Sequence, residues 1–403
     1  MSRHTRLIVL LLVLLPTLTR CASTPAKKKE EPPPPPPPPI ANMSIDELRQ
    51  EVLEYLEGRM AAPGEEKSAD TAQKKDAWRQ RAHELVALFR KRIHEDLMAR
   101  IEQDFGVNAP LQSETVSLEA LDERGRVVEV PVSVETRELR SLTLPANRAK
   151  MHALMGEEDL TLALYSGAPA TIAPQESKGF MRAYTGEEAE ALAMEAKLVI
   201  TLKGGEWVES GGAGTVANAI AIRGLDMDQG LHDNTNKRYD DTMFVIVEDS
   251  GGTYSAYEYR MTTESSSERR GVGRLDSKQV IYVRGLHRGV DPAYKLKGGA
   301  AEGTRVQMEG DFKIVGANVH SAYSKRPITS DTPLKENVSL GCQVVAASKP
   351  DFEKSMVYTL DKLGVKEFPY TIVDEEELAF LDQSLQEKGK RSLLVHAVSR
   401  GAT

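Results

Sequence analysis

A run of eight prolines at residues 32–39 excludes helix and sheet from that part of the chain, because proline lacks a backbone N–H and fixes its own φ. Such a run forms an extended polyproline II rod, which spans roughly 25 Å at about 3.1 Å per residue. The charged residues 27–31 before it cannot build a core. We therefore expect residues 22–42 to be a disordered, proline-rich tether.

Residues 1–21, ahead of the tether, are typical of an export signal. Basic residues precede an apolar run at residues 7–15, which is too short to cross a bilayer. Residues 18–21, Leu-Thr-Arg-Cys, resemble a bacterial lipobox, in which the cysteine is lipidated, although Arg20 stands where the box has a small residue. The resemblance implies a lipid anchor at Cys21 in a membrane of the cell envelope, facing the periplasm, with the outer membrane favoured. The alternative is an ordinary signal peptide and a secreted protein.

The composition narrows the class of protein. Of 403 residues, 28% are charged and 40% are hydrophobic, which is typical of a globular protein, and the length suggests two or three structural units. The formal net charge is −8, and no basic stretch with interleaved aromatic residues is present. Both observations argue against a nucleic-acid-binding protein.

Residues 43–106 have the periodicity of helices. Ser44 and Glu47 form a capping box, and apolar residues three or four positions apart predict a second, longer helix over residues 72–104. No motif identifies a protein partner for these helices.

Residues 107–197 are predicted to be an α+β linking region. Apolar and polar residues alternate on both sides of the polar residues 122–125, which predicts a β-hairpin. Short helices are predicted at residues 146–165 and 187–197.

Residues 198–375 are predicted to be a mostly β domain, because short apolar runs recur between glycine-containing turns. The predicted strands lie at residues 199–202, 216–222, 243–247, 254–261, 280–283, 305–308, 312–315 and 370–373. A helix and a loosely held tail at residues 376–403 complete the chain. The fold class that we expect is therefore α+β, with an N-terminal helical region and a β-rich C-terminal domain.

Cys342 is the only cysteine outside the leader, so the folded part carries one thiol and no intramolecular disulfide. A lone cysteine with a histidine elsewhere in the chain is a candidate nucleophile and base. Gly341 before it suits a sharp turn, Ser339 can hold that turn, and His320 can accept the thiol proton. The alternative is a buried cysteine that packs as a small apolar residue.

The order His320-Ser321, a gap and then Ser339-Leu340-Gly341-Cys342 resembles the catalytic signature of L,D-transpeptidases of the YkuD type. The resemblance implies Cys342 as nucleophile, His320 as base and the Ser321 carbonyl as the group that orients the histidine. We expect the imidazole and the thiol to lie within about 4 Å of each other. Leu340 departs from the family, which has a second histidine there.

The same resemblance implies a cysteine acyltransferase that acts on peptidoglycan stem peptides through a thioester, as an L,D-transpeptidase or L,D-carboxypeptidase. A looser resemblance to uncharacterised bacterial and phage proteins suggests that polar residues before the strands form one cleft with Cys342. These residues include Arg223, Asp241 and Thr263, and the residues predicted to bind substrate are Arg238, Tyr239, Asp240 and Ser339.

Neither a metal nor an organic cofactor is predicted. His232, His287 and His320 lack the spacing of a metal motif such as HExxH, and the glycine-rich residues 211–214 lack the pattern of a nucleotide-binding loop. A non-catalytic envelope lipoprotein that binds peptidoglycan with the same fold stays the alternative to the enzyme.

Overall fold

A computed structural model describes residues 40–60, 69–107, 109–122, 124–156, 172–234, 238–266, 273–305, 312–335, 338–339 and 341–396. The chain divides into two compact units, residues 1–43 and 44–403, and the finer domain division stays a prediction. The leader with Cys21 and residues 22–39 of the tether lie outside the described residues. Residues Ile40–Asn42 form a short 3₁₀ helix, η1, at the end of the predicted tether.

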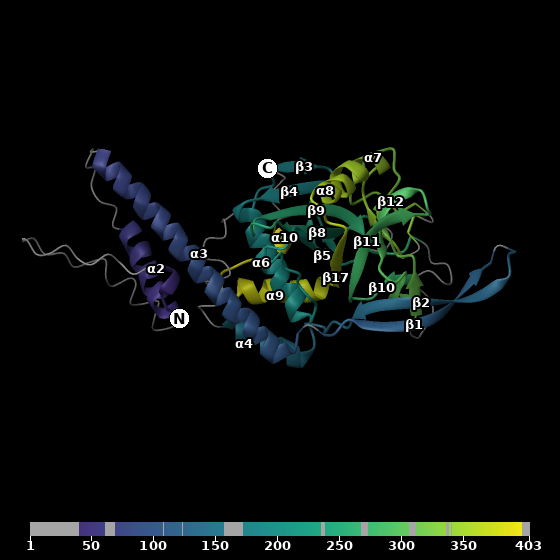
Figure 1. Cartoon of the computed structure of the whole chain (residues 1–403), viewed down its shortest axis with the longest axis horizontal. Helices are drawn as coiled ribbons and strands as arrows, with labels where there is room; N and C mark the ends of the chain where they lie inside the picture. The colour runs from purple at the N-terminus through teal and green to yellow at the C-terminus, as the bar shows by residue number, and fades with distance from the viewer. Residues whose placement is uncertain are drawn as a thin grey trace, which may run out of the picture. The chain divides into compact units, whose positions relative to one another are not determined.

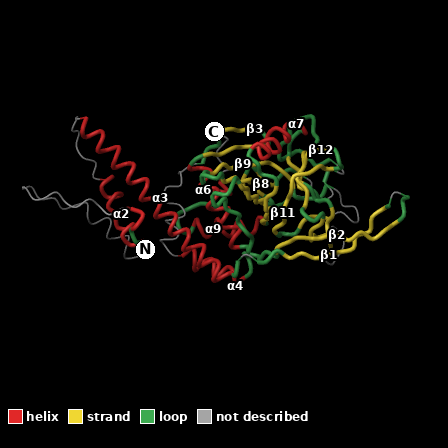
Figure 2. Tube along the Cα trace, in the orientation of Figure 1, coloured by secondary structure: helices red, strands yellow, loops and turns green. Residues whose placement is uncertain are grey.

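Helices and one large mixed sheet make up the described part of the second unit, so the predicted α+β class is confirmed (Figures 1 and 2). Within the described residues, no helix combines the length and the apolar character that crossing a membrane requires.

Two helices begin the second unit, α2 (Ile45–Met60) and α3 (Ala69–Phe105). The predicted capping box is present, because Ser44 N donates to Glu47 Oε2 at 2.7 Å and Glu47 N donates to Ser44 Oγ at 3.3 Å. One stripe of α3 is buried, and it consists of Leu85, Phe89, Ile93, Leu97, Ile101 and Phe105. This stripe packs against α2, α4 (Pro145–Gly156) and α6 (Glu187–Leu202). The packing stabilises α3 although most of its residues are polar.

The predicted hairpin is formed by β1 (Gln112–Leu121) and β2 (Val127–Arg137), which pair antiparallel from Gln112 with Thr136 to Leu121 with Val127. Asp122 closes the turn, since its Oδ1 accepts from the backbone N–H groups of Arg124 and Arg126 at 2.8 and 2.9 Å.

Helix α6 corrects the prediction of a helix over residues 187–197 and a strand over residues 199–202, because one helix covers both segments. Val199, Ile200, Thr201 and Leu202 are all buried in its last turn. A short apolar run that is buried on every side has the same composition in a helix as in a central strand, so its periodicity could not separate the two.

Eight described strands close into a ring. They are β5 (Val216–Ile222), β8 (Asp241–Glu248), β9 (Tyr254–Thr262), β11 (Gln279–His287), β12 (Asp291–Leu296), β15 (Val319–Ser321), β16 (Gln343–Val345) and β17 (Glu367–Val373). Neighbours pair in the order β11-β12-β15-β16-β9-β8-β5-β17, and β17 pairs with β11 again. The pairs β15–β16 and β5–β17 are parallel, and the other six are antiparallel.

Seven further strands complete the sheets. They are β3 (Glu176–Lys178), β4 (Met181–Thr185), β6 (Leu225–Asp226), β7 (Gly230–Leu231), β10 (Gly273–Leu275), β13 (Ala300–Arg305) and β14 (Phe312–Val315). Strand β4 pairs with β9, and β2 pairs with β11, so the hairpin is joined to the ring through one edge of β11.

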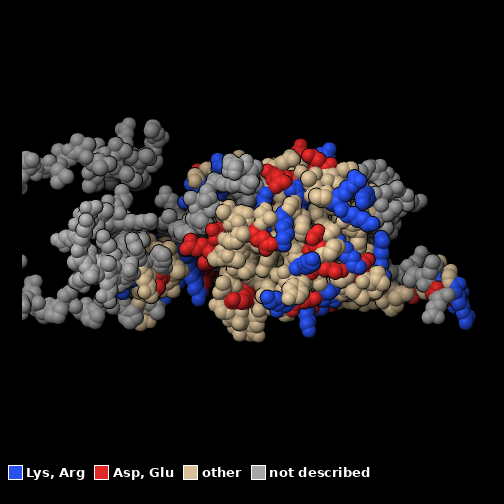
Figure 3. All heavy atoms as spheres, turned by 90° about the horizontal axis from the view of Figure 1, so that it is seen from above, with Lys and Arg blue, Asp and Glu red and all other residues tan. Residues whose placement is uncertain are grey.

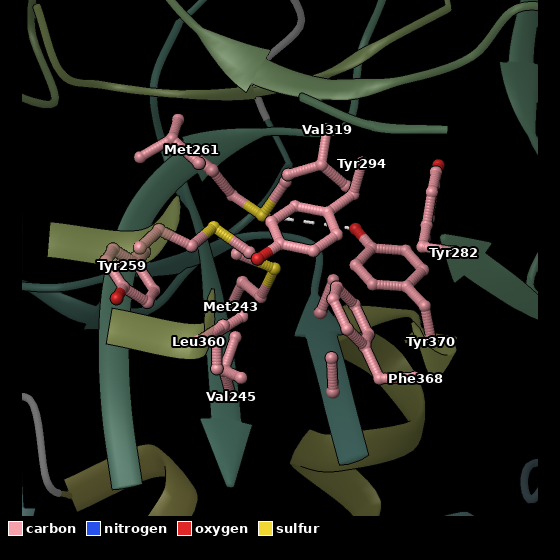
Figure 4. Packing of buried hydrophobic residues seen from close by; sticks show 14 of the residues in the cluster. Met243, Val245, Tyr259, Met261, Tyr282, Tyr294, Val319, Leu360, Phe368 and Tyr370 are labelled. Atoms are coloured by element: carbon pink, nitrogen blue, oxygen red, sulfur yellow. Dashed lines mark hydrogen bonds between the residues drawn. The ribbon is translucent and has the colours of Figure 1, made fainter. Parts of the chain in front are cut away.

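The core is built from alternate residues of the ring strands, as the period of two requires (Figure 4). It contains several aromatic residues, and Tyr282 meets Tyr370 edge to face with ring centroids 5.0 Å apart. The continuous helical segment α7 (Lys349–Phe352), η2 (Glu353–Val357, a π-helical turn) and α8 (Tyr358–Lys362) adds Phe352, Met356 and Leu360 to the same core. Two more helices follow, α9 (Glu375–Gln386) and α10 (Leu393–His396).

Candidate active site

Strands β15 and β16 position the predicted catalytic pair. They are parallel neighbours in which Val319 pairs with Gln343 and His320 with Val344. Val319 and Val345 belong to the core cluster, so His320 and Val344 point to the opposite face of the sheet. Cys342 directly precedes β16, and Gly341 before it has φ of 118°, a conformation that side-chain-bearing residues rarely adopt.

The structure brings His320 and Cys342 together and adds His287 from the last position of β11. One nitrogen of each imidazole and the sulfur of Cys342 lie within 4.8 Å of one another. The two imidazole rings stack, with centroids 4.2 Å apart and planes inclined by 29°. We call these three residues the histidine–thiol cluster.

The tautomer of His320 follows from its hydrogen bond. Its Nδ1 lies 2.7 Å from the carbonyl oxygen of Ser321, which only accepts, so Nδ1 carries the proton. The lone pair is therefore on Nε2, which is buried and has no hydrogen-bond partner among the described residues. This contact matches the role that the resemblance implies for Ser321, and it leaves Nε2 as the atom that can accept a proton.

Burial, together with the nearby His287, lowers the pKa of His320 to about 4. The pKa of His287 is also lowered, by burial and by the charge of Arg288. Both imidazoles are therefore neutral at pH 7, which is the state in which a histidine can act as a base.

His287 is a site residue that sequence reasoning missed as a neighbour of Cys342. Its Nδ1 accepts from Asn318 Nδ2 at 2.9 Å, so its proton is on Nε2, which is buried without a hydrogen-bond partner among the described residues. The register of β11 carries the signal: Val280 and Tyr282 face the core, so His287 faces the side of His320. Leu340, where the family has its second histidine, lies outside the described residues. His287 supplies a second imidazole from another strand.

Cys342 packs on its other side in an apolar cluster and is 8% exposed. This cluster consists of Tyr239, Ala322, Ile328, Leu334, Cys342, Val344 and Ala346. The thiol also donates to the carbonyl oxygen of Gly316 at 3.5 Å. Its surroundings are therefore apolar on one side and imidazole on the other.

Ser339 holds the turn before Cys342. Its hydroxyl donates to the Cys342 carbonyl oxygen at 2.8 Å and accepts from Gly341 N at 3.3 Å. Ser266 fixes the same segment, because its hydroxyl donates to the Ser339 carbonyl at 2.7 Å and accepts from Ser339 N at 3.0 Å. Ser339 is completely buried and its hydroxyl bonds the turn, as the sequence predicts, and its role in substrate binding stays a prediction.

The other residues predicted to bind substrate are three consecutive residues that differ in burial. Tyr239 packs in the apolar cluster with Cys342, and Asp240 beside it is 2% exposed. Arg238 is exposed and pairs with Asp331 at 3.5 Å. Of the three, Tyr239 is the one that shares a cluster with the thiol.

Arg223, Asp241 and Thr263 do not line an open cleft with Cys342, which corrects the predicted arrangement. All three are buried and bond one another: Asp241 Oδ2 accepts from Thr263 N at 2.6 Å and from Thr263 Oγ1 at 2.8 Å, and Arg223 Nε donates to Thr263 Oγ1 at 3.1 Å. Asp374 and Glu264 complete this arginine network, at 2.8 and 3.6 Å from Arg223. A buried charge must be paired, so the role of these side chains is to neutralise and hydrogen-bond one another.

Backbone strain is concentrated beside the histidine–thiol cluster. Among the described residues, Arg288 and Tyr323 are the two non-glycine residues with positive φ, at 51° and 52°. Arg288 follows His287 directly, and the Tyr323 ring stacks on His320 with centroids 5.4 Å apart. Strained residues of this kind gather at functional sites.

A hollow of about 400 Å³ lies beside the apolar cluster. Its lining includes Ile328 and Ala346, which also pack in the cluster that holds Cys342. The charged residues in its lining are Lys178, Lys325, Arg326 and Asp351, so three positive charges face one negative charge. This surface suits a ligand that carries carboxylates.

No family model, no curated protein and no solved structure matches the chain.

Proposed function

We propose that this protein is a cysteine acyltransferase of the cell envelope, similar to YkuD-type L,D-transpeptidases, that acts on peptidoglycan stem peptides. The observation that carries the proposal is the histidine–thiol cluster, in which a ring nitrogen of neutral His320 lies within 4.8 Å of Cys342 Sγ. The Ser321 carbonyl holds this imidazole by its Nδ1–H. A thiol, a neutral base and a group that orients the base are the parts that nucleophilic catalysis by cysteine needs.

The reaction proceeds in two stages. Nε2 of His320 takes the thiol proton as Sγ bonds to a peptide carbonyl carbon, the peptide C–N bond breaks, and the imidazolium returns the proton to the leaving amine. The resulting thioester is attacked by an amine or by water, whose proton passes to His320 and then to the departing thiolate. The acceptor decides between transpeptidation and hydrolysis.

His287 takes part as a hydrogen-bond donor. The proton on its Nε2 is buried and has no hydrogen-bond partner among the described residues, so it is available to a negatively charged oxygen or sulfur. The N–H groups of the turn at Gly341 are a second source of donors. Donors fixed before reaction stabilise the oxyanion of acyl transfer without reorganisation.

The hollow of about 400 Å³ beside the apolar cluster is the proposed binding site for the carboxylates of the stem peptide. Lys178, Lys325 and Arg326 supply the charge, and Ile328 and Ala346 connect the hollow to the packing around the thiol. The surface drawn in Figure 3 mixes both signs of charge, which favours a peptide ligand over nucleic acid.

We place the protein in the bacterial cell envelope, held by a lipid on Cys21 and facing the periplasm. The leader and the proline run support this placement, since a spacer is needed between a membrane and peptidoglycan. Fatty-acid labelling of cells tests the anchor: label should enter the full chain and be lost in Cys21→Ala, and equal labelling of both would contradict it.

The enzyme is tested by trapping the thioester. Full-length protein is incubated with a purified stem peptide and quenched in acid, and the mass of the peptide containing Cys342 is measured. We expect an acyl adduct that is absent in Cys342→Ser and that forms roughly 10²–10⁴-fold more slowly in His320→Gln, because general-base catalysis contributes that much. His232→Gln is the matched control, since the His232 side chain hydrogen-bonds only the neighbouring Asp233 carbonyl among the described residues.

A non-catalytic peptidoglycan-binding protein is the second candidate, and the low exposure of Cys342 favours it. The same experiment separates the two. Binding of stem peptide by wild type and Cys342→Ser alike, with no adduct on either, would replace the enzyme by the binding protein.

A further inference from the structure

We propose that the histidine–thiol cluster is also a Zn²⁺ site, and that the ion, held by His287, His320 and Cys342, masks the thiol. The masking rests on the proposed function, whereas the site itself does not. His320 lies 33 positions after His287, and Cys342 lies 22 positions after His320. No local motif therefore predicts the cluster, and the fold brings the three residues together.

The spacing of the ligand atoms suits a single ion. One nitrogen from each histidine and the sulfur lie within 4.8 Å of one another. A tetrahedral Zn²⁺ with its usual bond lengths places such atoms roughly 3.3–3.6 Å apart, so the side chains close inward by about 1 Å when they bind the ion. Exposed fractions of 8%, 1% and 8% for His287, His320 and Cys342 show that these donors are already out of bulk water.

The outer nitrogens of both imidazoles are already engaged. Nδ1 of His320 is bonded to the Ser321 carbonyl oxygen at 2.7 Å, and Nδ1 of His287 is bonded to the Asn318 amide at 2.9 Å. Both Nε2 atoms are buried without a hydrogen-bond partner among the described residues. Histidine ligands of metals donate the N–H of the nitrogen that does not bind the ion to an acceptor, as His320 does to the Ser321 carbonyl.

The amide of Asn318 can follow the change of tautomer that metal binding requires of His287. Its Oδ1 is buried and also lacks a hydrogen-bond partner among the described residues. Metal binding needs the lone pair of His287 on Nε2, so the proton moves to Nδ1, and the Asn318 amide turns over to let Oδ1 accept it. One ion then gives a partner to two buried atoms, His287 Nε2 and His320 Nε2, and the turned amide lets Asn318 Oδ1 accept from His287 Nδ1.

The ligand set selects the metal. One sulfur and two imidazole nitrogens, with no carboxylate in the cluster, suit borderline-soft Zn²⁺ and not Mg²⁺ or Ca²⁺. Three protein ligands leave one position open. Binding removes the thiol proton to solvent, and the thiolate lone pair goes to the ion, so no electron is transferred.

Masking follows from the same geometry. A sulfur bound to Zn²⁺ cannot attack a peptide carbonyl, and His320 Nε2 cannot take a proton while it binds the ion. Zinc therefore turns the proposed enzyme off, and removal of zinc turns it on.

The site is tested by titrating the full chain with Zn²⁺ against a chromophoric chelator, after metal removal under reducing conditions. We expect one ion per chain and a loss of affinity of roughly 100-fold or more in each of Cys342→Ser, His287→Gln and His320→Gln. Asn318→Leu should lose about 10–100-fold, as outer partners of metal ligands do. His232→Gln should bind as wild type does, and circular dichroism establishes that each variant is folded.

Two further readouts complete the test. Co²⁺ in place of Zn²⁺ should give thiolate-to-cobalt absorption that Cys342→Ser abolishes, and one equivalent of Zn²⁺ should slow alkylation of Cys342 by iodoacetamide at least tenfold. Binding that is absent, or unchanged in the three ligand variants, overturns the site. Unchanged alkylation overturns the masking. A protein that binds zinc here but never forms the thioester when metal-free loses the proposed function and keeps the site.

Discussion

Two buried polar regions of this protein differ in how completely their hydrogen bonds are satisfied. In the arginine network, Asp241 Oδ1 accepts from Gly224 N at 2.9 Å while its Oδ2 is bonded to Thr263, and Arg223 donates from all three of its nitrogens. In the histidine–thiol cluster, the Nε2 atoms of His287 and His320 have no hydrogen-bond partner among the described residues. The hydrogen bonds of the arginine network are satisfied by groups of the chain itself. The two Nε2 atoms of the histidine–thiol cluster need a bound ligand to gain a partner.

The difference separates a structural from a functional use of buried polarity. Unsatisfied buried groups cost about 1–3 kcal/mol each, so a chain retains them where a ligand or a reaction needs them. The backbone agrees with this division, since Arg288 and Tyr323 with their positive φ lie beside the histidine–thiol cluster. Near the arginine network the turn is made by a glycine: a Cβ on Gly224 would lie 2.5 Å from the His232 carbonyl oxygen.

The largest effect is expected from breaking the satisfied region. Arg223→Met should lower the free energy of unfolding by about 3–5 kcal/mol, because it removes the counter-charge of Asp374 and leaves the buried carboxylate of Glu264 with Arg274 alone. Urea unfolding followed by circular dichroism measures the change.

The matched control for that substitution is Arg238→Met. Arg238 pairs with Asp331 at 3.5 Å with side chains 50% and 78% exposed, and such pairs contribute about 0–1 kcal/mol. Equal losses in the two variants would show that the arginine network is no more important to stability than a surface pair.

The next effect concerns the pH dependence of the unsatisfied region. The pKa of His320 is about 4 in the folded state against 6.5 for an ordinary histidine, so the unfolded chain binds more protons between these values. Stability is therefore present above pH 6.5 and is lost as the pH falls toward 4. Between pH 7 and pH 4.5 the wild type should lose about 2 kcal/mol more than His320→Gln.

The comparison with His320→Gln is needed because other groups act in the opposite direction. Burial raises the pKa of Asp241 and of Glu258 to about 7, so their contributions to stability fall as the pH rises from 4 to 7. These terms are the same in both proteins and cancel in the difference. Unfolding curves of the two proteins that shift equally with pH would show that His320 is not held neutral by the fold.

The sequence predicted those parts of the fold whose signals are local. Residues 216–222 form β5 at the predicted bounds, because an apolar run between glycine turns is a strand signal by itself. The predicted end of the helix at residue 197 was wrong, because residues 199–202 are buried on all sides and their apolar run resembles a strand. Closure of the ring could not be predicted from the sequence, because β17 pairs with β5 and β11, which are distant in the chain.

The candidate site divides in the same way. His320 and Cys342 lie on adjacent parallel strands, and their order along the chain carries the resemblance that predicted them. His287 comes from the end of β11, and its contact depends on the pairing of β11 with β12 and of β12 with β15, which no local pattern reveals. Ser339 holds the turn before Cys342 as predicted, because the hydroxyl of a turn residue hydrogen-bonds the neighbouring backbone, and its role in substrate binding stays a prediction.

The smallest effect tests the strain beside the histidine–thiol cluster. Arg288 is exposed and has φ of 51°, a conformation that glycine adopts at little cost. Arg288→Gly should raise the free energy of unfolding by about 0.5–1 kcal/mol, measured in urea at pH 7. Gly289→Ala at the next position, where φ is 76° and nothing crowds a Cβ, should lower it by a similar amount. Opposite signs in these neighbours would locate strain at Arg288, whereas a loss of stability in Arg288→Gly would show that the arginine side chain holds the turn and that its backbone is not strained.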